Sequence, residues 1–218
     1  MNRFTPLLVI TIVAAMTGGM ALRLGDTGHA AWLISRASGL AAFGLLSGAM
    51  IFGLLISSKA ADGSMSRLTV FTVHQFLSVL SLAFIAVHGG SLLFDGFFHF
   101  TVFDLVIPFV APFAPVMVGL GVISAWLAAA VTGSFWARKW IGQKAWRKLH
   151  FASFAAYLLS FVHGISAGTD SSLAPVSMMY AISLTTVLAL LFYRIARASS
   201  GRSGRTARPL PKANPRPV

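Results

Sequence analysis

Four of the six histidines lie inside apolar segments, where an ionisable side chain is costly and usually functional. His74 and His88 share one segment, 14 residues apart. On a helix this is about 21 Å of rise, and both side chains lie within about 40° of one face. His150 and His163 share another segment, 13 residues apart, or about 19.5 Å. If the two helices run parallel, His74 faces His150 and His88 faces His163, at two matched depths.

Two imidazoles that face each other at each of two depths are typical of haem iron with two axial histidines. Zinc would need three or four ligands close together, and no third candidate accompanies either pair in the sequence. The chain has no cysteine, which excludes disulfides, thiolate-ligated haem, Cys-held iron–sulfur clusters and covalently attached c-type haem. The residues therefore favour two haems, with a proton relay as the open alternative.

The composition predicts an all-α integral membrane protein. Of 218 residues, 56% are hydrophobic and only 10% are charged, and the mean hydropathy is +0.80. These values exclude a soluble enzyme, a disordered chain and a nucleic-acid-binding domain. We expect a bundle of six transmembrane helices, because each apolar span can cross a hydrocarbon core of about 30 Å. The six spans are residues 5–22, 32–57, 69–94, 114–136, 148–167 and 173–196.

The spans define the domain organisation. Residues 1–197 form the predicted haem-binding transmembrane domain, and residues 198–218 a disordered basic cytoplasmic tail. The first span also resembles a signal peptide, because Asn2-Arg3 precedes its apolar run. The longest connector, 95–113, is rich in Phe and Pro and is expected to lie at the membrane interface.

Basic residues predict the orientation. The chain has 17 Lys and Arg against 5 acids, and only Arg23 and Arg36 lie on the side of the membrane opposite the termini. Lys and Arg accumulate on the cytoplasmic side. We therefore expect a multi-pass protein of the cytoplasmic (inner) membrane with both termini in the cytoplasm. The lipid bilayer, rather than nucleic acid, explains the net charge of +12.

The fifth span conflicts with an ideal helix. Thirteen residues rotate about 1300°, which leaves His163 about 140° away from the face of His150. A π-bulge, a kink or a wide bundle face must absorb this difference. We therefore expect an irregularity between His150 and Gly164.

Four short motifs match a known family: His74-x13-His88, His150-x12-His163, Trp146-Arg147-Lys148-Leu149-His150 and Gly168-Thr169-Asp170. Over about residues 30–196 the chain resembles the ferric-reductase-like transmembrane domain. NADPH oxidases, ferric reductases and the haem-binding membrane subunit of the methionine sulfoxide reductase system share this domain. The resemblance implies a six-helix bundle that binds two b-type haems non-covalently. The presence of His74 fits the two-haem oxidase and reductase branch better than it fits the methionine sulfoxide reductase subunits.

The resemblance also implies partners for the haem propionates. Arg36 matches an Arg that lies near the outer haem in NADPH oxidases. The resemblance implies that Arg36 is a propionate partner or a polar group that faces the electron acceptor. Arg67, Arg147 and Lys148 lie near the inner haem level and are candidates there. Interfacial snorkelling and positive-inside topology also explain all four cations.

The implied function is single-electron transfer from a cytoplasmic reductant to an outer acceptor. Outside the membrane spans the sequence has no phosphate-binding glycine loop, so a separate flavoprotein, a small FMN-binding partner or quinol must supply electrons. Ferric iron, oxygen, quinone and a protein remain open as acceptors. Two other classes stay open. One is a haem-free transporter or channel that uses the intramembrane histidines, and the other is a structural subunit that anchors a redox partner.

Overall fold

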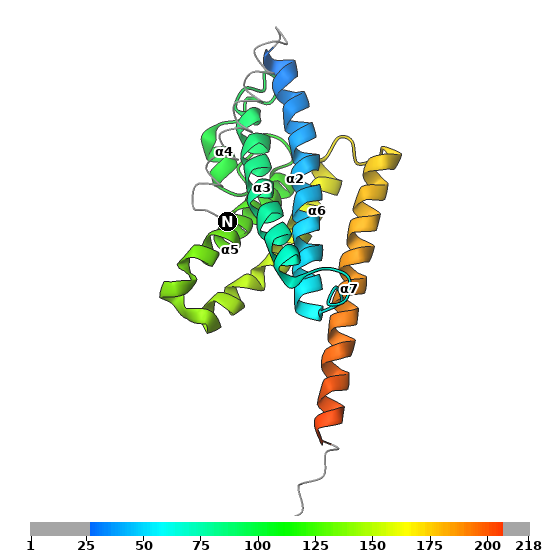
Figure 1. Cartoon of the computed structure of the whole chain (residues 1–218). Helices are drawn as coiled ribbons and strands as arrows, with labels where there is room; N and C mark the ends of the chain where they lie inside the picture. The colour runs from blue at the N-terminus through cyan, green and yellow to red at the C-terminus, as the bar shows by residue number, and fades with distance from the viewer. Residues whose placement is uncertain (1–26, 207–218) are drawn as a thin grey trace, which may run out of the picture.

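The computed structural model describes residues 27–206, with side chains described from residue 29 to residue 199. These residues form helices and no strand (Figure 1). The helices are α2 (Thr27–Ser58), α3 (Arg67–Leu92), α4 (Val102–Val106), α5 (Pro115–His150), α6 (Ala152–Ala167) and α7 (Ala174–Thr206). The predicted all-α architecture is therefore confirmed for this part of the chain.

Four of these helices, α2, α3, α5 and α7, are long and apolar enough to cross a membrane. The shorter α6 is also apolar but has only 16 residues. The protein is therefore an α-helical membrane protein. The first predicted span, residues 5–22, lies outside the described residues.

Helix α2 is central to the packing and runs between α3 and α7 (Figure 1). Phe43, Met50 and Leu54 of α2 form a core cluster with residues of α6 and α7. A buried chain of hydroxyl groups joins the same three helices. Tyr157 Oη lies 2.7 Å from Ser183 Oγ, which donates to Ser47 Oγ at 2.8 Å. Such bonds satisfy polar groups that lipid cannot and hold membrane helices together.

The second packing unit is the hairpin of α5 and α6. Pro115 begins α5, where its missing N–H costs no hydrogen bond. The chain then reverses direction within α5 (Figure 1), because Gly142 has a φ of 79° and a ψ of 158° and interrupts the helix. A positive φ of this kind is accessible to glycine without a steric penalty. Ser124 Oγ donates to Ala156 O at 2.7 Å across the hairpin.

Two helical segments are longer than the sequence-based expectation. The segment between the predicted fourth and fifth spans is helical rather than a loop, except at Gly142. Its residues are good helix formers, and one glycine is enough to reverse the chain. Helix α7 continues to Thr206, past residue 198, where the predicted tail begins.

Candidate functional site

The four intramembrane histidines form two pairs between α3 and the α5–α6 hairpin. In the first pair, the ring centroids of His74 and His150 are 6.1 Å apart and the planes are inclined at 71°. In the second pair, the centroids of His88 and His163 are also 6.1 Å apart, with an inclination of 69°. The pairing predicted from the spacing is confirmed, and α3 and α6 run parallel.

Backbone carbonyls of neighbouring helices hold three of the four imidazoles. Nδ1 lies 2.8 Å from Ala49 O in His74, from Ser35 O in His88 and from Met117 O in His163. A carbonyl oxygen can only accept, so Nδ1 carries the proton in each of these rings. The other nitrogen, Nε2, then keeps its lone pair and is the atom available to a metal.

His150 is held differently. It is the last residue of α5, and its buried Nδ1 has no hydrogen-bond partner among the described residues. One turn earlier, Trp146 Nε1 is likewise buried without a partner, and the two rings are 5.1 Å apart. In the part of the chain that the structure describes, no carbonyl therefore sets the position of the proton on His150 Nδ1.

The expected irregularity after His150 is present at Phe151, where α5 ends and α6 has not yet begun. The Phe151 N–H donates to Lys148 O at 3.2 Å, and Phe154 N–H donates to Phe151 O at 3.1 Å. These are bonds of the 3₁₀ type, which turn the chain about 20° more per residue than an α-helix does. The tighter turn rotates α6 in the direction that brings His163 toward His88.

The residues of each pair fit a metal ion held between two imidazoles. With metal–nitrogen bonds of about 2 Å, and with each nitrogen on the line between the ring centres and roughly 1 Å from its own centre, the centroids would be about 6 Å apart. The observed separation is 6.1 Å in both pairs. No hydrogen bond joins the two imidazoles of either pair. The described residues also contain no group of three or more His, Cys, Asp or Glu side chains suited to a metal ion. Among the described residues, each pair therefore offers two imidazole nitrogens and no third side chain of these types.

Three glycines lie against the same imidazoles. Gly39 of α2 faces His88, Gly53 of α2 faces His74, and Gly121 of α5 faces His163. The positions of the histidines alone do not identify these glycines. One signal was available, because Gly39 and Gly53 are 14 residues apart, the same separation as His74 and His88.

The four predicted cofactor-binding cations have different environments. Both carboxylate oxygens of Asp170 accept hydrogen bonds from Arg36, the Nε bond at 2.7 Å, and the guanidinium also lies 4.1 Å from the centre of the Trp32 ring. Arg36 follows Ser35, the partner of His88, so this ion pair lies beside the second pair. Its partner in the structure is therefore a carboxylate of the chain itself.

Arg67 begins α3 and donates to Asp62 at 2.8 Å and 3.1 Å, on an exposed surface. The bond to Arg67 holds the pKa of the Asp62 carboxyl below its usual range. Arg147 and Lys148 are exposed in the last turn of α5, next to His150. These two cations therefore lie close to the first pair along the chain.

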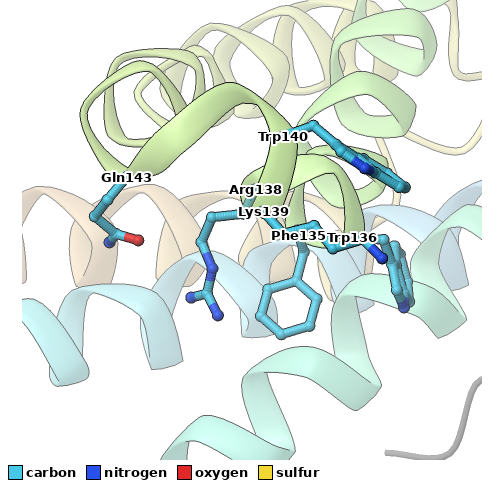
Figure 2. A pocket seen from close by; sticks show the side chains of 6 residues that line it. All are labelled: Phe135, Trp136, Arg138, Lys139, Trp140 and Gln143. Carbon is cyan, nitrogen blue, oxygen red and sulfur yellow. The ribbon is translucent and has the colours of Figure 1, made fainter.

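A surface cavity of about 570 Å³ lies at the turn of α5, on the side of the first pair. Figure 2 shows Trp136 and Trp140 on one side of it and Arg138 and Gln143 on the other, with Phe135 and Lys139 completing the lining. The guanidinium of Arg138 lies 5.4 Å from the centre of the Trp146 ring, which in turn packs on His150. A cationic and aromatic surface therefore adjoins the first pair.

The fold and the two imidazole pairs define a class: an α-helical membrane protein with two two-histidine sites at different depths. Comparisons of the chain with protein-family models, with curated proteins and with solved structures found no match.

Proposed function

We propose that the protein is a di-haem b-type membrane cytochrome of the ferric-reductase-like kind, which carries single electrons across the cytoplasmic membrane. One observation carries the proposal: two imidazole pairs have the same 6.1 Å ring separation, one at each end of α3. This separation suits one iron per pair. When bound, haem supplies the one-electron chemistry, and the protein supplies ligation, burial and orientation.

Each side chain then has a defined role. His74 and His150 hold the inner haem, and His88 and His163 hold the outer one. The carbonyls of Ala49, Ser35 and Met117 fix the orientation of three of these rings. Arg67, Arg147 and Lys148 are candidates for the inner propionates, and Arg36 for an outer one or for the acceptor side.

The basic segment around Gly142 supports the orientation. Arg138, Lys139 and Lys144 adjoin the first pair, so the positive-inside rule puts this pair on the cytoplasmic side and both termini in the cytoplasm. The cavity lined by Trp136, Arg138 and Trp140 is then on the side from which an electron-donor flavoprotein or quinol would approach. The acceptor, whether ferric iron, oxygen, quinone or a protein, would bind on the Arg36 side.

Optical spectroscopy tests the proposal directly. Protein purified from haem-replete cells should show a Soret band and, after reduction with dithionite, a sharp α-band, at about two haems per chain. Protein without a Soret band under these conditions would exclude the cytochrome. Flux that depends on pH in reconstituted vesicles would then favour the haem-free proton relay or solute transporter.

A further inference from the structure

Three of the four imidazoles are held by the same local arrangement on a neighbouring helix. His88 Nδ1 donates to Ser35 O, and the residue four positions after Ser35 is Gly39. The imidazole of His88 lies directly against this glycine. The arrangement recurs for His74 with Ala49 and Gly53, and for His163 with Met117 and Gly121.

The glycine gives the imidazole access to the carbonyl. In an α-helix the carbonyl of residue i already accepts from the N–H of residue i+4, and a second lone pair remains for another donor. A Cβ on residue i+4 would stand where the second donor arrives. An ideal Cβ on Gly39 would lie 2.8 Å from His88 Nδ1, and one on Gly121 would lie 2.8 Å from His163 Nδ1. Both distances are shorter than real Cβ contacts.

The contact between Gly53 and His74 is looser than the other two. An ideal Cβ on Gly53 would lie 3.2 Å from His74 Cε1 and 3.5 Å from its Nδ1, so a shift of a few tenths of an ångström would relieve the contact. His150 lies outside this arrangement, because no residue that the structure describes accepts or donates a hydrogen bond at its Nδ1. The arrangement therefore holds both rings of the second pair and one ring of the first.

We propose, building on the function proposed above, that Gly39, Gly53 and Gly121 are positioning residues. Each opens a backbone carbonyl to an imidazole, keeps the proton on Nδ1, and so leaves Nε2 free for iron. The glycines act through the histidines and touch no reacting atom.

Matched alanine variants separate this role from helix stability. The test variants are Gly39→Ala, Gly121→Ala and Gly53→Ala. The controls are Gly44→Ala in α2 and Gly133→Ala in α5, where an added Cβ would meet none of the described residues within 4 Å. Alanine favours a helix more than glycine does, so a loss in the test variants alone cannot come from helix propensity.

The first measurement uses protein prepared without haem. Solid-state NMR of ¹⁵N-histidine-labelled protein in lipid distinguishes a proton on Nδ1 from a proton on Nε2. We expect Gly39→Ala and Gly121→Ala each to remove the Nδ1-protonated signal of one histidine, while Gly44→Ala and Gly133→Ala keep all of them. Identical spectra in test and control variants would overturn the proposal.

A second measurement needs no substitution and therefore does not depend on variants that fold. Protein carrying ¹³C-carbonyl methionine and ¹⁵N-histidine should show a dipolar coupling between Met117 C′ and His163 Nδ1, because Nδ1 lies 2.8 Å from Met117 O. Absence of this coupling in the unsubstituted, haem-free protein would overturn the arrangement at α5.

Haem binding separates this proposal from the proposed function. If haem binds, Gly39→Ala and Gly121→Ala should weaken it at the second pair by about 10- to 100-fold, as loss of a ligand's outer partner does elsewhere. Gly53→Ala should have a smaller effect on the first pair. Haem affinities equal to those of the controls would overturn the positioning role and leave the cytochrome intact. If no haem binds, the cytochrome fails, while the NMR results still decide whether the glycines position the imidazoles.

Discussion

The two imidazole pairs have the same ring separation but are held in different ways. In the second pair, the carbonyls of Ser35 in α2 and Met117 in α5 hold both rings. In the first pair, only His74 is held, by Ala49 O. His150 ends α5 beside the 3₁₀-type turn at Phe151, and its buried Nδ1 has no partner within residues 29–199.

This difference shows that the geometry of a pair and its restraint are separate properties. Two sites with equal distances can differ in how firmly their ligands are oriented, because orientation depends on the hydrogen bond of the nitrogen that does not bind metal. The second pair is preorganised on both sides. The first pair is preorganised on one side and lies next to the surface cavity lined by Trp136 and Arg138.

Removal of one ligand from each pair should have the largest effect. We expect His74→Ala and His163→Ala each to lose about half of the bound haem, because each pair holds one iron. The double variant should bind none. Haem per chain, measured as the pyridine complex, checks this result. His99→Ala in the exposed connector is the control and should retain both haems.

An unchanged haem content in either single variant would exclude that histidine as a ligand. If both single variants lost all haem, the two sites would be interdependent, and the treatment of the pairs as separate units would be wrong.

The two imidazole pairs should release haem at different rates. A protein that scavenges haem should extract it from the first pair about tenfold faster than from the second, because the orientation of His150 is not fixed. Extraction followed by absorbance should therefore have two phases of equal amplitude. In His163→Ala, which keeps only the first pair, we expect the fast phase alone. In His74→Ala only the slow phase should remain. The reverse order would contradict the proposed difference in restraint.

The smallest expected difference is between two ion pairs, Arg36–Asp170 and Arg67–Asp62, in their contributions to stability. Asp170→Asn removes the half-buried partner of Arg36 beside the second pair and should cost roughly 0.5 to 1 kcal/mol of stability. Asp62→Asn removes the exposed partner of Arg67 and should leave stability unchanged within error. Thermal unfolding of both variants in the same detergent checks this order. Equal losses of stability in the two variants would show that burial does not make the Arg36–Asp170 ion pair more stabilising than the Arg67–Asp62 ion pair.

Much of the site was predictable from local features of the sequence. The lengths of the apolar segments predicted the long helices, and the spacings of 14 and 13 residues predicted which imidazoles face each other. The rotation left over between His150 and His163 predicted an irregularity, which the structure has as 3₁₀-type hydrogen bonds around Phe151. The segment around Gly142 was expected to be a loop, because its charges suggested a connector and hid its helix-forming residues.

The partners of the imidazoles were not predictable in the same way. That Gly39 faces His88, and that Asp170 binds Arg36, depends on the register between segments 49 and 134 residues apart. Nothing in the local pattern of either segment records that register.

By itself, the sequence determined an apolar helical chain with four intramembrane histidines at two matched depths. Both features follow from hydropathy and helical rise, which are local properties of the chain. Only the tertiary structure decided which carbonyl holds each imidazole and left His150 without one. Those contacts depend on how α2 and α5 pack against α3 and α6, and packing sets distances between residues remote in sequence.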